Sequence, residues 1–407
     1  MEKWKKNLYV VFFAQMIAIT GMSFIVPFLP FYVRQIGITD VKMAAQWTGW
    51  IMSAPALVMV IASPLWGFLA DRVGRKPMVE RALFGSSIVI FLMAWASNIQ
   101  QLLFLRLLQG LLTGTVAACI ALISASSPSK KMGFSLGLLQ TGVFLGTFLG
   151  PLLGGISADI LGFRNSFKIT AVLLFFAGWL VFFLVEENFS PSGAKKNNIV
   201  FNKIKALIFT DKLIPIMFFV LFIFRFSIKL ITPIISLFVE MIAPNSNHVS
   251  VLTGIMFALT GLMSAFSAMN IGKLIENAPS KNILLLIISL IGSGFFFLAQ
   301  GFVINIVQFA FLRLCLGLFY GAITPIVNTI ISLSTPLKHQ GKIFGVSSSI
   351  TFLGSVFGPI TGGYIMVQFN ISTVFILAGS LLLITGLIFP IFVEKIKILT
   401  FFRLKND

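Results

Sequence analysis

Two basic side chains one helical turn apart are the residues of this chain whose chemistry most needs a partner. Arg225 and Lys229 lie within an apolar stretch, residues 213–240, with no Asp or Glu nearby. At 1.5 Å per residue they would lie about 18 Å and 24 Å from the start of a helix, on one face, where like charges repel. A water-filled cavity or an anionic ligand would relieve that cost. The alternative is that the side chains extend to the helix end, which suits Lys229 better than Arg225.

A short charged segment, Gly-Phe-Leu-Ala-Asp-Arg-Val-Gly-Arg-Lys-Pro at 67–77, separates two long apolar stretches. Gly67 and Gly74 permit a tight turn and a close approach of helices. Asp71 can accept hydrogen bonds from the positive N-terminal end of a neighbouring helix. Arg72 and Arg75 can bind headgroups or opposing carboxylates. If the segment only set the orientation of the chain, its acid and its glycines would have no explanation.

Two further arginines fall inside apolar stretches. Arg106 is followed by Gln109 and Gly110, and Arg313 is followed by Gly317. An arginine at the centre of a membrane helix costs roughly 2.5–3.5 kcal/mol on insertion, so each side chain should face protein or water. Both a structural anchor on backbone carbonyls and a role in coupling remain open.

Small residues at spacings of mostly four follow one face of the stretch 134–158: Gly142, Gly146, Gly150, Pro151, Gly154 and Gly155. Such a stripe lets two helices touch backbone to backbone. Pro151 removes one helix hydrogen bond and permits a kink. Ordinary close packing is the alternative to a specialised role.

Three polar residues inside apolar stretches complete the candidate binding set, namely Gln15, Gln140 and Asn328. The 12 acidic residues fall in loops, tails or helix ends, so we expect no carboxylate at the centre of a span. No metal-ligand cluster, phosphate loop or nucleophile–base pair is apparent. The sequence therefore predicts no enzyme activity, no cofactor and no metal ion.

The elements that position these residues are predicted to be membrane helices. Of the 407 residues, 57% are hydrophobic and only 10% charged, whereas soluble domains carry roughly 25% charged residues. A spanning helix needs about 20 apolar residues. We predict an all-α membrane protein with twelve spans: 8–33, 46–69, 78–97, 101–125, 134–158, 166–186, 213–240, 249–272, 282–300, 303–332, 342–367 and 372–393.

The predicted domains are two six-helix bundles, residues 1–187 and 213–407, joined by a cytoplasmic linker at 188–212. The net charge of +18 does not predict a nucleic-acid partner, because most Lys and Arg fall in alternate loops. That bias places both termini in the cytoplasm.

The two halves repeat each other. The charged segment recurs weakly at 272–281, and Arg106-x-x-x-Gly110 recurs as Arg313-x-x-x-Gly317. The Gly-Pro-x-x-Gly-Gly of residues 150–155 recurs at 358–363. Three motifs in one order at nearly one spacing indicate a duplication.

These motifs resemble the major facilitator superfamily of transporters, and the resemblance covers essentially the whole chain. It implies two bundles related by an axis along the membrane normal, with substrate near the midplane. It also implies a cytoplasmic latch at 67–77, a motif at Arg106 and Gln109, and an exporter signature at Gly150 and Pro151. Residues 27–33 and 341–344 are similar to the MdtG-like multidrug-resistance, drug–proton antiporter branch.

The function we expect is secondary active export of a small anionic metabolite, such as a carboxylate siderophore, across the bacterial inner membrane. Arg225 and Lys229 favour an anion, as does Arg34, which replaces the acid that the resemblance implies. A broad multidrug–proton antiporter and an importer of an anionic metabolite or siderophore are the alternatives. The expected partners are the substrate, the bilayer and, as a candidate coupling ion, protons. The protein is expected to be a monomer.

Overall fold

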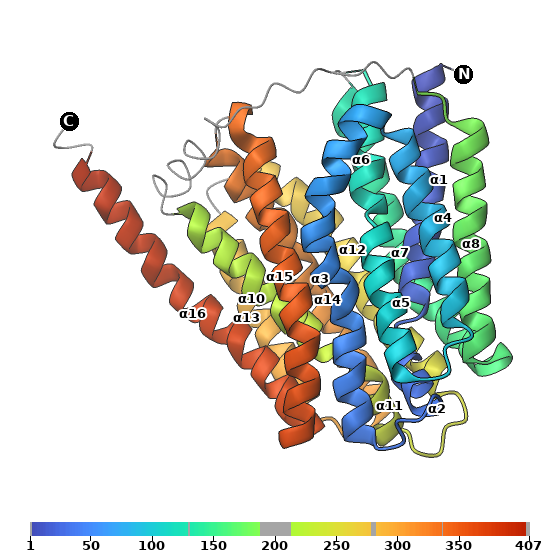
Figure 1. Cartoon of the computed structure of the whole chain (residues 1–407). Helices are drawn as coiled ribbons and strands as arrows, with labels where there is room; N and C mark the ends of the chain where they lie inside the picture. Colours follow the sequence, from blue (N-terminus) through green and yellow to red (C-terminus); the bar gives the residue numbers. More distant parts are fainter. Residues whose placement is uncertain (1, 129–130, 188–212, 278–281, 336, 404–407) are drawn as a thin grey trace. The chain divides into compact units, whose positions relative to one another are not determined.

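The computed structural model describes the chain except residues 1, 129–130, 188–212, 278–281, 336 and 404–407. It describes only the backbone at 272–273, 275–277, 337–339, 341–342 and 392–403. Every regular element of the described chain is a helix (Figure 1). The predicted all-α class is confirmed.

The first sequence half forms helices α1 (Lys3–Phe24), α2 (Leu29–Gln35), α3 (Val41–Val73), α4 (Lys76–Met93), α5 (Ile99–Leu112), α6 (Thr115–Ser126), α7 (Met132–Leu161) and α8 (Phe163–Leu184). The second half forms α10 (Leu213–Ile231), α11 (Ile235–Ile242), α12 (Val249–Asn277), α13 (Asn282–Gln300), α14 (Ile306–Leu333), α15 (Leu337–Gln368) and α16 (Ile371–Arg403).

Eleven helical segments of the described chain are long and apolar enough to cross a membrane. Helix α4 lies between two of them in sequence and has 18 residues, but its first two turns carry Lys76, Glu80 and Arg81. Because α4 is no longer than 18 residues, all three charges fall in its one stretch of that length, whereas each longer segment contains such a stretch with at most two charges. The helices are consistent with the predicted twelve spans, with α4 as the third.

The first helix of each half is interrupted, which the sequence prediction of continuous spans at 8–33 and 213–240 missed. Turns at residues 25–28 separate α1 from α2, and turns at 232–234 separate α10 from α11. Pro27 and Pro233 occupy these turns. Proline has no amide hydrogen to donate and crowds the preceding turn, so each helix ends there.

A third interruption separates α5 from α6 at Gly114, whose φ of 117° suits glycine. The carbonyls left open by the break find donors on neighbouring helices. Trp66 Nε1 donates to the Leu111 carbonyl at 2.6 Å, and Arg81 Nη2 donates to the Thr113 carbonyl at 3.2 Å. The Arg81 guanidinium also lies 3.6 Å from the Trp66 ring centroid. Side chains of α3 and α4 therefore stabilise the break between α5 and α6.

The chain forms two compact units, Met1–Lys195 with Thr232–Ala258, and Lys196–Ile231 with Leu259–Asp407. In the first unit, α1 packs against α7 and α8, α4 against α8, and α3 against α5. In the second, α10 packs against α15 and α16, and α13 against α14 and α16. The predicted linker, 188–212, lies outside the described residues, so the predicted boundaries of the two bundles remain a prediction.

Candidate functional site

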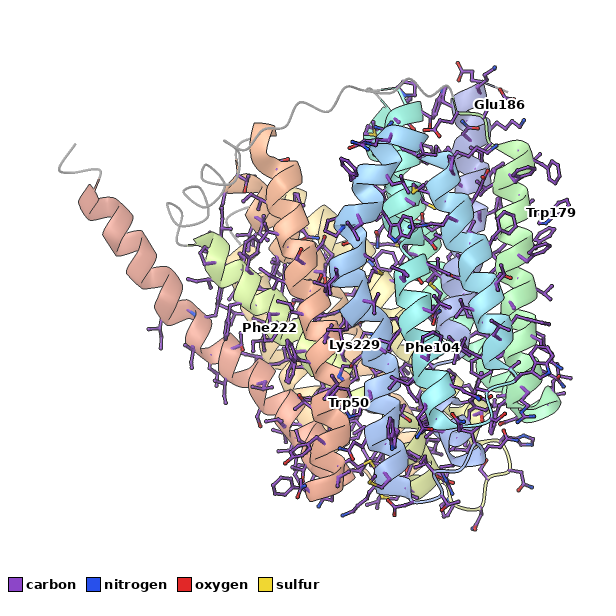
Figure 2. All side chains as sticks on the ribbon, viewed as in Figure 1. Trp50, Phe104, Trp179, Glu186, Phe222 and Lys229 are labelled. Carbon is purple, nitrogen blue, oxygen red and sulfur yellow. The ribbon has the colours of Figure 1, made fainter. Side chains whose placement is uncertain are left out.

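The half-buried face of α10 alternates aromatic and basic side chains. Phe222, Arg225, Phe226 and Lys229 follow one another at spacings of three, one and three residues, which keeps them on one side of the helix. The Phe222 and Phe226 rings stack with centroids 5.9 Å apart. Figure 2 labels Phe222 and Lys229 along this helix. The predicted pair of cations thus belongs to an amphiphilic surface.

Arg225 has one polar partner in the neighbouring helix α15. Its Nε donates to Ser355 Oγ at 3.1 Å, while Ser355 Oγ donates to the Thr351 carbonyl at 3.1 Å. Lys229 lies in the last turn of α10, where a positive charge is favoured by the partly negative carbonyl end of the helix. Among the described residues neither cation forms an ion pair with a carboxylate.

The membrane spans of this unit contain no acidic residue. The spans Leu213–Ile231, Asn282–Gln300, Ile306–Leu333, Ile343–Gln368 and Ile371–Ile391 carry Arg225, Lys229 and Arg313 but no Asp or Glu. Charges removed from water are costly unless they are compensated. Water, or an opposing charge from outside these spans, is therefore what can compensate these cations.

Two glycines of α15 bring that helix against the base of both cations. A Cβ placed on Gly354 would lie 3.0 Å from the Arg225 Cβ, and one on Gly358 would lie 2.7 Å from the Lys229 Cβ. The backbones of α10 and α15 therefore meet beside the basic face.

We call this glycine-lined contact between two helices a seam. The first unit contains the equivalent seam, between α1 and α7, without the charges. Gly146 and Gly150 of α7 take the same places against the Cβ atoms of Ile19 and Ser23 in α1. The glycines recur 208 residues later and their partners 206 residues later, so Ile19 corresponds to Arg225 and Ser23 to Lys229. Close packing of this seam does not require a cation.

The other three predicted binding residues differ in exposure. Gln15 is buried in α1 and donates through Nε2 to the Leu139 carbonyl at 3.2 Å, while its Oε1 has no hydrogen-bond partner. Gln140, the next residue of α7, is exposed, and Asn328 of α14 is half-buried. The first two belong to one unit, and Asn328 belongs to the unit of Arg225 and Lys229.

The charged segment turns at one glycine only. Helix α3 continues through the exposed Gly67 to Val73, so Gly67 does not form the predicted tight turn. Gly74 makes the turn with a φ of 110°. Asp71 and Arg72 are exposed on the last turn of α3, and the Arg72 guanidinium lies 4.2 Å from the Phe68 ring centroid.

The sequence interpretation missed the acid that caps α4. Glu187 accepts hydrogen bonds from the backbone amides of Arg75 at 3.0 Å and Lys76 at 2.7 Å. A carboxylate is favoured at the positive N-terminal end of a helix. Lys76 Nζ in turn donates to the Phe182 carbonyl at 2.8 Å. The segment is thus fastened to the end of α8.

Glu186 fastens the start of α1 to the same place. Asn7 and the Glu186 backbone exchange two hydrogen bonds, of 2.7 Å and 3.1 Å. Lys3 lies 3.0 Å and Lys6 3.8 Å from the Glu186 carboxylate. The hydrogen bond from Lys3 lowers the pKa of Glu186 below its ordinary value. The adjacent acids at the end of a span were the available signal for both contacts.

The weaker copy of the charged segment falls on residues 272–281. Of Gly272, Lys273 and Glu276 only the backbone is described, and Lys281 lies outside the described residues.

Arg106 and Gln109 lie buried together on α5, where Arg106 Nη1 donates to Gln109 Oε1 at 3.1 Å. Arg106 Nε has no hydrogen-bond partner in the described chain. The next residue, Gly110, contacts the Pro55 backbone of α3 so closely that a Cβ would overlap it. The arginine therefore has one side-chain partner from its own helix, and this pairing does not assign it a role.

Arg313 is also buried, with its guanidinium 5.5 Å from the Phe309 ring centroid on α14. Gly317 lies against the Thr260 carbonyl of α12, as Gly110 lies against α3. The repeated Arg-x-x-x-Gly motif thus places its glycine at a helix contact in both units.

The glycine stripe of α7 contacts two helices. Gly150 and Gly154 lie against the backbone of α1, whereas Gly155 lies against the Ser250 carbonyl of α12. Pro151 remains inside the helix and does not end it, and its carbonyl contacts Gly254. The predicted backbone-to-backbone packing is present.

Asp159, one turn beyond the stripe, accepts a hydrogen bond from the Val251 amide at 3.0 Å. This acid therefore caps the first turn of α12.

Arg34 and Glu240 form an ion pair that the sequence interpretation did not join. Arg34 Nη1 lies 2.8 Å from both Glu240 carboxylate oxygens. The two residues lie on the short helices α2 and α11, 206 residues apart. No local pattern links residues at this separation.

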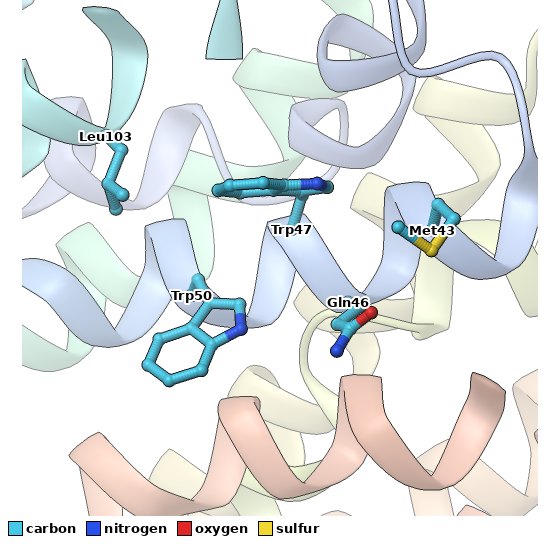
Figure 3. Close-up of a pocket in the computed structure, with 5 residues that line it drawn as sticks. All are labelled: Met43, Gln46, Trp47, Trp50 and Leu103. Atoms are coloured by element: carbon cyan, nitrogen blue, oxygen red, sulfur yellow. The ribbon is translucent and has the colours of Figure 1, made fainter. Parts of the chain in front are cut away.

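A cavity of about 300 Å³ lies at the first turns of α3. Its lining is mostly apolar: Met43, Gln46, Trp47, Trp50 and Leu103 (Figure 3). Two indole rings and no charged group suit an apolar, flat molecule.

Comparison with known proteins identifies the family of this chain. The model of the Major Facilitator Superfamily matches residues 11–299 and 217–398. The chain belongs to this superfamily. It is accordingly a multi-pass membrane transporter.

The similar relatives include "Multidrug resistance protein MdtG" of Proteus mirabilis (strain HI4320), 35% identical over 92% of each chain. The protein of the same name from Salmonella arizonae is 36% identical over 94% of each chain. The predicted resemblance to the multidrug-resistance branch is thereby confirmed.

Two solved structures support the fold. The human organic anion transporter MFSD10 (TETRAN) has a TM-score of 0.69 at 17% identity, over 95% of this chain and 99% of its own. A bacterial homologue of the human lysosomal transporter Spinster, in an inward-facing, unoccupied conformation, has a TM-score of 0.74 at 14% identity, over 96% and 95%.

Proposed function

We propose that the chain is a multidrug exporter that works by alternating access in the bacterial inner membrane and is coupled to protons. The similarity to MdtG along 92–94% of the chain carries this proposal. It favours the multidrug antiporter over the export of an anionic metabolite that the sequence led us to expect, because the relatives are named for drug resistance and not for a single metabolite. The glycine and proline stripe of α7 supports the direction of transport.

The chemistry of the cavity in the first unit supports an apolar substrate. Trp47, Trp50 and Met43 offer large, polarisable surfaces without a charge. Such surfaces accept molecules of different shape, because they impose few directional contacts. This lining supports the proposed broad specificity.

The gating residues of the proposal are those of the repeated motifs. Gly67, Asp71, Arg72, Gly74 and Arg75 would form a latch on the cytoplasmic side. Their exposure leaves Asp71 and Arg72 accessible to a partner.

Deeper in the bilayer, the proposal assigns coupling to Arg106 with Gln109 and to Arg313. Gly150 and Pro151 would let α7 slide against its neighbours, since most of their close contacts are with backbone atoms.

A small anionic metabolite, such as a carboxylate siderophore, is the second candidate substrate. Arg225 and Lys229 favour it, because their unit supplies no acid within its spans. Whether this metabolite would be exported or imported is tested by the vesicle experiment below.

The test uses everted membrane vesicles from cells that express the chain, which bring its cytoplasmic side outward. We expect energised vesicles to accumulate a lipophilic dye such as ethidium, and accumulation to collapse when the proton gradient is dissipated. Vesicles that accumulate a citrate-type siderophore but no dye would reverse the order of the two candidates. Uptake of the siderophore into right-side-out vesicles would support import.

The same assay tests the latch. We expect Asp71→Asn to lower the initial rate of dye accumulation by about tenfold, which corresponds to about 1.4 kcal/mol, at an unchanged amount of protein in the membrane. Asn305→Ala, which removes a helix cap away from the segment, is the matched control. Equal rates for Asp71→Asn and the wild type would reduce the segment to an orientation signal.

A further inference from the structure

We propose that the basic face of α10 is a subsite for the acidic group of an aromatic or otherwise lipophilic carboxylate. The subsite comprises Phe222, Arg225, Phe226 and Lys229, with Ser355 of α15 behind it. This inference rests on the proposed export function and specifies a chemical class among its substrates.

The order of the side chains on α10 matches the two parts of such a molecule. The stacked rings of Phe222 and Phe226 offer an apolar surface to a ring system. Arg225 lies between them in sequence, and Lys229 follows one turn after it. A carboxylate that lies against both cations would place its apolar part along the two rings.

Ser355 orients the guanidinium of Arg225. The serine hydroxyl accepts from Nε and donates its own hydrogen to the Thr351 carbonyl. Because Nε is occupied by this contact, the two Nη groups are the donors of Arg225 that the proposal assigns to a ligand. A guanidinium presents its donors in a planar fork that fits a carboxylate.

The repeat shows that these charges are additions to a packing unit that does not need them. The seam of α1 and α7 has the same glycine contacts with Ile19 and Ser23 in place of Arg225 and Lys229. A purely structural role would apply to both seams. The second seam alone carries two like charges on one helix face, whose mutual repulsion an anion relieves.

No acid in the spans of this unit can serve as the permanent counter-charge. A bound carboxylate supplies it only when substrate is present. The subsite therefore distinguishes an acid from its neutral isostere by electrostatics and not by shape.

The test measures binding to the purified full chain in an uncharged maltoside detergent, without lipid. The probes are 2-naphthoate and its neutral analogue 2-naphthamide. We expect naphthoate to bind at least tenfold more tightly, equivalent to about 1.4 kcal/mol. Equal affinity of the wild type for the two probes overturns the proposal without any variant.

Variants then assign the preference to its residues. Arg225→Gln or Lys229→Gln should reduce the preference for naphthoate to less than threefold and leave naphthamide binding unchanged. Arg225→Lys and Lys229→Arg, which keep the charge, should retain most of it. The matched control is Lys168→Gln, because Lys168 lies over the Trp95 ring on the other unit. A preference that survives both neutral variants overturns the assignment.

Anionic lipid is the competing source of negative charge. Phosphatidylglycerol is therefore added in a separate titration. Binding of this lipid that depends on Arg225 and Lys229, with no preference for naphthoate, would assign the pair to a headgroup and overturn the proposal. Because binding requires no transport, vesicles that fail to export dye would overturn the proposed function alone.

Discussion

Single residues of this chain form their most informative contacts over long sequence distances. Arg34 and Glu240 are separated by the same 206 residues as Pro27 and Pro233, so they hold equivalent positions in the two repeats. They nevertheless contact each other. Both residues belong to the first compact unit, which combines Met1–Lys195 with Thr232–Ala258. By the predicted orientation this ion pair lies on the outer side of the membrane, where we expect it to stabilise the contact of α2 with α11.

We expect charge reversal at either residue to alter transport and reversal at both to restore it. The side chains are 32% and 38% exposed, and such pairs contribute about 0.2–1 kcal/mol. Arg34→Glu and Glu240→Arg should each change the initial rate of dye transport by roughly two- to fivefold, given an added repulsion of similar size. The Arg34→Glu, Glu240→Arg double variant should lie within twofold of the wild type. Additive losses in the double variant would show that the pair has no shared role.

Some residues of the candidate site could be predicted from the sequence and others could not. Arg225 and Lys229 stand out locally, because a basic residue in an apolar stretch is rare. The adjacent acids Glu186 and Glu187 at the end of a span indicate a contact, but not that Glu187 caps a helix 112 residues away. The partner of Arg34, at a separation of 206 residues, has no local signal. The same limit applies to Ser355, whose hydroxyl is one of many in α15.

At the scale of elements, the spans could be predicted and their interruptions could not. Hydropathy identifies a long apolar helix, but proline has different effects in different spans. Pro55, Pro64 and Pro151 remain inside helices. Pro27 and Pro233 lie in turns. The difference depends on whether neighbouring groups satisfy the open carbonyls, which is a tertiary property.

The contact of α10 with α15 predicts a position-specific response to added volume. In Gly358→Leu the new side chain would meet the backbone of Phe226 and Leu230, and such overpacking costs about 1–3 kcal/mol. Thermal unfolding of the detergent-purified protein should therefore begin at a lower temperature. In the matched control Gly345→Leu, on the same helix, nothing lies within 4 Å of the added Cβ. Equal midpoints for the two variants would contradict the backbone contact.

Comparison of the two repeated units shows a difference that no single residue or helix shows by itself. Both units use the same seam, but only the second places cations in it, so the duplicated scaffold carries a pair of charges that is not duplicated. The glycine contacts pair Ile19 with Arg225 and Ser23 with Lys229, and this pairing shows the difference between the two seams. The sequence repeat alone aligned the glycine motifs without showing which residues of α1 and α10 they contact.

The orientation of the molecule in the membrane gives the last prediction. The basic bias of alternate loops predicts that both termini and residues 188–212 lie in the cytoplasm and that the loop after α11 lies outside. A single cysteine at Ser192 or at Asn245 is introduced after Cys119→Ala and Cys315→Ala. In intact cells a membrane-impermeant maleimide should label Asn245→Cys only, and after permeabilisation it should label both. The cysteine-free parent should stay unlabelled. Labelling of Ser192→Cys in intact cells would invert the topology and, with it, the direction of every transport step proposed for this chain.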